Sequence, residues 1–154
     1  MSINEADSPA HWLAPDEERA WRAYLRMVTA VQDRTARDLA AQGLSEPDYE
    51  VLSTLSEHPE GTSTLHEQAT KMTWSRSRLS RHASRMEARG LIRRAPDPAD
   101  GRGCLLVLTP TGWNTLREAA PLHVASVRRH FVDRLDPEEL ATLDRIARKL
   151  AADR

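Results

Sequence analysis

The sequence predicts a mainly α-helical protein that carries one small β-hairpin. Three observations support this fold class. Apolar residues recur at steps of three and four along most of the 154 residues. Helix-capping residues stand before several of these stretches. Two short apolar segments, 91–95 and 104–109, flank "PDPADGRG", whose Pro, Gly and Asp content is typical of a hairpin tip. With 40% hydrophobic residues, the chain is long enough for one compact domain with a core.

The N-terminal part is predicted to form one long helix over residues 15–42, after a loose segment of about ten residues. Pro15 suits its first turn, and Gly43 is a natural stop. Nearly thirty helical residues span roughly 40 Å at about 1.5 Å per residue. This is long for so small a domain, so we expect part of the helix to pack on something outside its own core.

Two shorter helices are predicted next. Ser45 caps the first of them, which the sequence "HPEG" at 58–61 ends. Either Ser63 or Thr64 caps the second, which continues through Met72.

The remaining elements complete a recognisable order. Ser75 caps a further helix that ends near Gly90, and the hairpin follows. Thr109 and Asp136 then cap the last two helices. A short helix, a turn, a second helix and a hairpin together make a winged helix-turn-helix.

The charge of the chain is concentrated in one segment. The formal net charge is only −1, yet residues 71–94 contain eight basic residues against Glu87 alone. That segment therefore carries +7 and the rest of the chain −8. Because the positive charge is concentrated in this one segment, we expect one face of the protein to bind one anionic partner.

The helix that begins after Ser75 has the properties of a DNA recognition helix. Leu79, Ala83 and Met86 share one side and are expected to face the core. The opposite side is small and polar, so its backbone can approach a major groove while arginines reach guanine edges or phosphates. The N-terminal residues of such a helix meet the bases; here they are Ser75, Arg76, Ser77, Arg78 and, one turn later, Arg81. Phosphate contacts are expected from the arginines further along, Arg85, Arg89, Arg93 and Arg94.

The hairpin tip adds a second candidate contact. Arg102 can enter a minor groove, where narrow A·T-rich stretches concentrate negative potential. Asp100 could pair with Arg102 and fix its direction. The alternative for the whole basic region is a solvated surface helix, but such faces normally interleave acids with the arginines.

The run "SRSRLSRHASRMEARGLIRRAPDPADGRGCLLVLTPTG" resembles the recognition helix and wing of the MarR family of bacterial transcriptional regulators. "LSEPDYEVLSTLSEHPEG" and "LDPEELATLDRIARKL" also match, so the resemblance covers almost the whole chain. It implies a homodimer in which residues 1–44 and 110–154 dimerise and residues 45–109 form the DNA-binding lobe. It further implies a pseudo-palindromic operator and a repressor released by a small ligand, often a phenolic or aromatic acid. The family's wing Asp and Arg fall on Asp100 and Arg102.

Candidate effector contacts lie near the first helix, where the family's ligand cleft opens. Trp12 and Tyr24 offer aromatic surface, and Arg22 or Arg26 could hold an effector carboxylate. Core or dimer packing is the alternative role for Tyr24.

Other function classes find little support. Cys104 alternates with apolar residues in a strand-like segment, which favours packing over redox sensing. His123 and His130 have no further ligands at metal-binding spacing, and no catalytic motif occurs, so we expect neither a metal, a cofactor nor an enzyme. No signal peptide and no bilayer-spanning run is visible, and the single cysteine fits a reducing compartment, so we expect a soluble, cytoplasmic protein. The main alternative function is a winged-helix module that binds an acidic partner protein.

Overall fold

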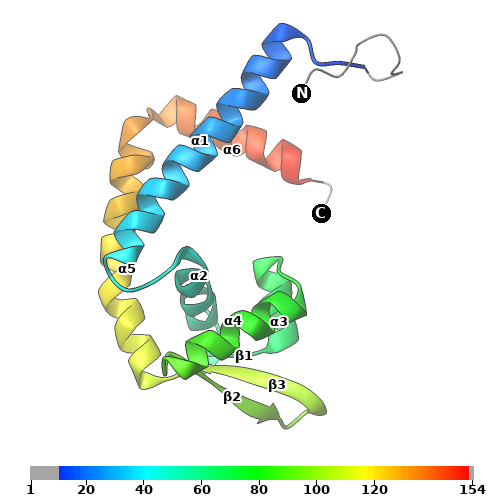
Figure 1. The fold of residues 1–154 in the computed structure, drawn as a ribbon, viewed down its shortest axis with the longest axis vertical. Coiled ribbons are helices and arrows are strands. Elements are labelled where there is room, and N and C mark those ends of the chain that lie inside the picture. Colours follow the sequence, from blue (N-terminus) through cyan, green and yellow to red (C-terminus); the bar gives the residue numbers. More distant parts are fainter. Residues whose placement is uncertain (1–10, 153–154) are drawn as a thin grey trace. The chain divides into compact units, whose positions relative to one another are not determined.

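The computed structural model describes residues 11–152, and the chain divides into two compact units, Met1–Asp33 and Arg34–Arg154. Helix α1 (Pro15–Ala40) begins in the first unit and ends in the second. The second unit then contains α2 (Glu46–Ser56), β1 (Thr62–Thr64), α3 (Leu65–Met72), α4 (Arg76–Ala88), β2 (Ile92–Asp97), β3 (Asp100–Leu108), α5 (Pro110–His130) and α6 (Pro137–Ala151) (Figure 1). Short 3-10 turns at Pro59–Gly61 and Val132–Arg134 complete the order. The predicted winged helix-turn-helix order is confirmed.

The capping predictions hold, and the structure settles the one that was left open. Ser45 and Thr64 each accept a hydrogen bond from the backbone three residues later and complete a capping box. Thr64 is therefore the cap of α3. Ser63 is instead buried in strand β1. The first helix ends at Ala40, slightly before the predicted residue 42, and Gly43 adopts the left-handed conformation (φ 73°) that follows a helix end.

The predicted hairpin is confirmed as β2 and β3, and a third strand that was not predicted, β1, extends it to a three-stranded antiparallel sheet. The strand order is β1-β3-β2, so β3 is the central strand and the short strand β1 pairs with it on the side opposite β2. The sequence prediction missed β1 because three polar or small residues carry no alternating pattern. Strands β2 and β3 also reach further than expected, to Asp97 and from Asp100, so the tip contains only Pro98 and Ala99. The register shifts at Pro96, where a proline interrupts the ladder.

The core of the second unit lies between α2, α3, α4, α5 and the sheet. Its members include Val51, Leu52, Leu55, Leu79, Ala83, Met86, Ile92, Leu106 and Leu116. Leu79, Ala83 and Met86 are fully buried, which confirms the predicted inner side of α4. Because this side of α4 packs into the core, the opposite face of the helix is directed toward solvent.

Among the described residues, α6 and α1 both leave apolar surface open in the single chain. No residue of α6 is buried, and Ile146 and Leu150 on its apolar stripe are 44% and 75% exposed. In the first unit, Trp21, Tyr24 and Leu25 of α1 are also exposed. Within the described part of the chain, no helix has both the length and the apolar character needed to cross a bilayer.

Candidate nucleic-acid interface

The turn between α3 and α4 sets the direction of the basic helix. Thr73 ends α3 in the left-handed conformation (φ 55°). Ser75 then caps α4, as its Oγ accepts a hydrogen bond from the backbone N–H of Arg78 at 3.1 Å. The predicted role of Ser75 as a helix cap is confirmed.

The solvent face of α4 carries the predicted DNA-contacting side chains. Ser75, Arg76, Ser77, Arg78, Arg81 and Arg85 are all exposed. Their contact with bases or phosphates stays a prediction.

The inner face of α4 holds one residue that the sequence analysis missed, His82, which is 8% exposed. Its spacing of three from Leu79 was the available signal, because it places the imidazole on the core side.

A buried polar network joins α4 to the start of α2. Asp48 accepts hydrogen bonds from the Ser45 backbone N–H (3.0 Å), from Arg89 Nη1 (2.7 Å) and, at Oδ1, from His82 Nε2 (2.9 Å). Arg89 also donates to the Gly43 carbonyl oxygen at 2.6 Å. Burial raises the pKa of Asp48, but the Ser45 N–H and the Arg89 guanidinium outweigh it and hold that pKa below its usual value. The carboxylate is therefore a fixed anchor between the two helices.

The protonation of His82 follows from its second partner. Arg85 Nη2 lies 3.0 Å from His82 Nδ1, and a guanidinium can only donate. Nδ1 must then accept, which leaves the proton on Nε2, facing Asp48. Burial lowers the pKa of His82 and outweighs the raising effect of Asp48. His82 is accordingly neutral and links Arg85 to Asp48.

Three of the four arginines predicted to contact phosphate have partners within the chain, and Arg85 with its bond to His82 is the first. Arg89 binds Asp48, as described. Arg94 donates to the Ser80 carbonyl oxygen (2.6 Å) and to Ser84 Oγ (2.9 Å), and its backbone N–H donates to Glu87. These bonds hold both guanidinium groups against the helices, and the predicted phosphate contacts of Arg89 and Arg94 stay predictions. Arg85, Arg89 and Arg93 are exposed, whereas Arg94 is half-buried.

A hollow of about 400 Å³ lies beside α4. It is lined by Pro47, Trp74, Arg78, Arg81, His82 and Arg85. The guanidinium of Arg78 stacks over the Trp74 ring at 3.7 Å from its centroid. The basic face of α4 therefore contains a concave site as well as projecting side chains.

At the wing, the structure changes the predicted role of Asp100. Its Oδ1 accepts a hydrogen bond from the backbone N–H of Arg102 at 3.0 Å. The carboxylate thus orients the backbone of the tip, not the guanidinium as expected. The Arg102 side chain is exposed at the end of the sheet.

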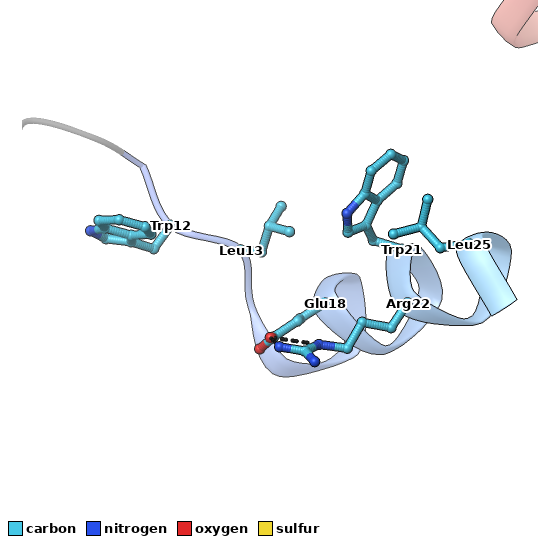
Figure 2. Close-up of a pocket in the computed structure, with 6 residues that line it drawn as sticks. All are labelled: Trp12, Leu13, Glu18, Trp21, Arg22 and Leu25. Carbon is cyan, nitrogen blue, oxygen red and sulfur yellow. Dashed lines mark hydrogen bonds and ion pairs between the residues drawn. The ribbon is translucent and has the colours of Figure 1, made fainter. Parts of the chain in front are cut away.

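The candidate effector residues divide between two places in the first unit. Trp12 and Arg22 line a hollow of about 500 Å³ together with Leu13, Glu18, Trp21 and Leu25 (Figure 2). Arg22 is already paired with Glu18, at 2.6 Å. Tyr24 stacks on Trp21 with the ring centroids 5.6 Å apart. Arg26 lines a separate shallow groove with Leu25, Thr29, Ala30 and Asp33.

The remaining candidate residues have structural surroundings. Cys104 is half-buried against the core. The ring of His123 lies against Tyr49, with centroids 4.2 Å apart, and His130 binds Asp38 at 3.0 Å. Residues 11–152 contain no group of three or more His, Cys, Asp or Glu side chains arranged to hold a metal ion.

Comparison with known proteins agrees with this architecture. The MarR family model matches residues 44–104. The transcriptional regulator HosA of Escherichia coli O111:H- is 32% identical over 130 residues, which cover 84% of this chain and 94% of HosA.

Two solved structures from Streptomyces coelicolor are similar over nearly their whole length. AbsC, a MarR family transcriptional regulator, shares 41% identity at a TM-score of 0.89, over 94% of this chain and 97% of AbsC. Sco3205, a MarR family transcriptional regulator solved in complex with DNA, shares 37% identity at a TM-score of 0.88, over 94% of this chain and 91% of Sco3205. The chain belongs to the MarR family of transcriptional regulators.

Proposed function

We propose that this protein is a transcriptional regulator that binds double-stranded DNA as a homodimer and represses transcription from a pseudo-palindromic operator. The observation that carries the proposal is the solvent face of α4. Arg76, Arg78, Arg81 and Arg85 project from it, while the inner face is locked to α2 through Asp48 and His82. A rigid helix with exposed serines and arginines suits insertion into a major groove.

The roles of the residues follow from their positions. The N-terminal half of α4, from Ser75 to Arg81, lies where a recognition helix meets base edges. Arg85, further along, is suited to a phosphate, and Arg102 at the wing to a minor groove. Asp100 supports Arg102 by fixing the backbone of the tip.

Dimerisation is supported by the apolar surfaces that the single chain leaves open. The stripe on α6 contains Ile146 and Leu150, and α1 exposes Trp21 and Leu25. A two-fold dimer can cover such stripes with their own copies. Two α4 helices would then read half-sites about one helical turn, roughly 34–36 Å, apart. The predicted division into dimerisation segments (residues 1–44 and 110–154) and a DNA-binding lobe (residues 45–109) depends on this dimer.

An aromatic effector is a further part of the proposal. The hollow around Trp12 and Trp21 offers two indole rings, which suit an aromatic group (Figure 2). Because Glu18 already neutralises Arg22, a phenol fits this hollow better than a carboxylate. Fluorescence of the tryptophans during titration with phenol and with benzoate tests this choice, and preference for benzoate would contradict it.

The experiment that tests the main proposal is selection from a random duplex pool, followed by binding measurements over a range of salt concentrations. We expect a palindromic preferred site and an affinity that falls steeply with salt. Arg102→Ala should weaken binding and relax preference at the flanks of the site, where the wing reaches. Binding without base preference, together with capture of an acidic protein, would instead support the protein-interaction module.

A further inference from the structure

The hollow beside α4 has the composition of an anion site. Three of its six lining residues are Arg78, Arg81 and Arg85, and none is a carboxylate. Stacking on Trp74 holds the Arg78 guanidinium in place. Positive charge on the wall of a concave site raises the local concentration of anions.

One lining residue differs from the others because it is buried and can titrate. His82 is 8% exposed, and its Nδ1 receives an N–H from Arg85 at the edge of the hollow. Arg85 itself is exposed, so it can swing away from His82 without disturbing the core. The Nδ1 of His82 would then face the contents of the hollow.

We propose that this hollow binds one phosphate group of the DNA backbone and that His82 takes up a proton as the phosphate binds. The inference rests on the proposed DNA-binding function and identifies one of its contacts. In the first step, a phosphate oxygen attracts the Arg85 guanidinium away from Nδ1. A proton from solvent then adds to Nδ1, and the new N–H donates to a phosphate oxygen, while Nε2–H stays on Asp48.

The charges around His82 explain why the proton arrives only with the phosphate. Asp48 of α2 faces Nε2, whereas Arg85 of α4 lies at Nδ1 and the charge of Arg78 also acts on the ring. Arg89, at the end of α4, neutralises much of the Asp48 charge. Trp74 meets the ring edge-on and carries no charge.

Without DNA, burial lowers the pKa of His82, and the two arginines add to this effect. A phosphate in the hollow compensates for the arginine charges and raises that pKa. By linkage, a group whose pKa rises on binding makes the affinity increase as the pH falls.

The test is the affinity for a mixed-sequence duplex about 30 base pairs long, measured at constant ionic strength between about pH 5.5 and pH 8. Wild type should bind about five- to tenfold more tightly for each unit of falling pH where the proton is taken up. His82→Gln keeps an N–H for Asp48 but cannot take up the proton, so this pH dependence should disappear. His11→Gln, a matched change at an exposed histidine in the first unit, should retain it. Equal pH dependence in wild type and His82→Gln would overturn the proposal.

A second measurement needs no variant. The imidazole C–H resonances of wild-type His82 report its pKa by NMR, with and without duplex. A pKa that rises on DNA binding supports the proposal, and an unchanged pKa overturns it.

Two further experiments distinguish a phosphate of the DNA backbone from a free phosphate ion. In the palindromic site selected from the random pool, replacing single backbone phosphates by neutral methylphosphonates should remove the pH dependence at one position per half-site. If inorganic phosphate shifts the His82 resonances while no methylphosphonate has this effect, the hollow binds free anions and the assignment to the DNA backbone is wrong. Firm but pH-independent binding counts against this inference alone, whereas no binding to any duplex at any pH counts against the proposed function itself.

Discussion

The guanidinium of Arg94 on β2 donates a hydrogen bond to the carbonyl oxygen of Ser80 on α4, at 2.6 Å. The same guanidinium donates a second hydrogen bond to Ser84 Oγ, at 2.9 Å. The wing strand is therefore fastened to the recognition helix by a side chain whose charge, read from the sequence, suggested a DNA contact. The two parts of the proposed interface are held in a fixed relation before DNA binds.

Arg94→Ala should therefore lower stability as well as affinity. Losing charged hydrogen bonds to Ser80 and Ser84 should cost about 1–3 kcal/mol in the free energy of unfolding, measured by urea denaturation. Arg93→Ala is the matched control, because Arg93 is its exposed neighbour on the same strand. The control should leave stability within about 0.5 kcal/mol and flatten the salt dependence of duplex binding by about one unit. Equal stability of the two variants would show that the Arg94 contacts contribute nothing.

Arg81 should read sequence. It is exposed on α4, opposite the buried Leu79 and Met86. If it is bidentate to a guanine, Arg81→Ala should cost roughly 1–3 kcal/mol on the best site and relax one position in each half-site. Arg81→Lys should not restore the preference, because an ammonium lacks the planar fork. The measurement compares the DNA sites that wild type and both variants select from a random duplex pool. Identical base preferences for all three proteins would show that Arg81 contacts only phosphate.

Acid should weaken the junction between α1 and α5. Ser126 Oγ and Arg129 donate to Asp38 at 2.6 and 2.7 Å, and with His130 they lower the pKa of Asp38 from 3.8 to about 2. A carboxyl group with a lowered pKa in the folded state stabilises the protein above its unfolded pKa, and this stabilisation is lost as the pH falls toward 2.

Asp38→Asn should thus be less stable than wild type at neutral pH, with a difference that shrinks between about pH 4 and pH 2. Urea denaturation at several pH values measures it. Asp144→Asn is the control, because Asp144 is exposed and pairs only within α6. A difference from wild type that stays constant with pH would contradict the assigned role of Asp38.

Gly112 should not tolerate alanine, although it lies in a helix. A Cβ at this position would collide with the carbonyl oxygen of Leu91. In an open helix, Gly→Ala usually stabilises by roughly 0.5–1 kcal/mol, but here we expect a loss of about 1–3 kcal/mol because backbone must shift. Thermal unfolding checks the sign. Gly101→Ala has open space around its Cβ and should be nearly neutral. A stabilised Gly112→Ala would mean that α5 packs less closely on Leu91.

The stripe on α6 should carry dimerisation. Ile146→Glu places a charge on a surface that is 44% exposed in the single chain, so the lobe should still fold while the dimer dissociates. Ala141→Glu, on the opposite side of α6, is the matched control and should stay dimeric. Sedimentation at micromolar concentration distinguishes the two. A dimeric Ile146→Glu would move the interface away from this stripe.

Local chemistry in the sequence determined the helices, their starts and the basic face. The caps Ser45, Ser75 and Asp136 act through hydrogen bonds to backbone only three residues away, so they can be recognised without knowing the fold. The side of α4 that faces solvent follows in the same way from the period of Leu79, Ala83 and Met86.

Contacts between distant segments were decided only by the tertiary structure. Strand β1 exists because β3 pairs with it, and the charges of Arg89 and Arg94 look the same in the sequence as that of Arg81. What separates them is the position of Asp48 and Ser80, which burial brings within hydrogen-bonding distance of Arg89 and Arg94. A guanidinium next to a buried carboxylate pairs with it, because an unpaired charge in the interior is costly. The Ser80 carbonyl oxygen accepts the Arg94 bond in addition to one from Ser84 Oγ. The sequence determines where the arginines lie along the chain, and the packing of α2 and β2 against α4 determines which of them are paired within the protein.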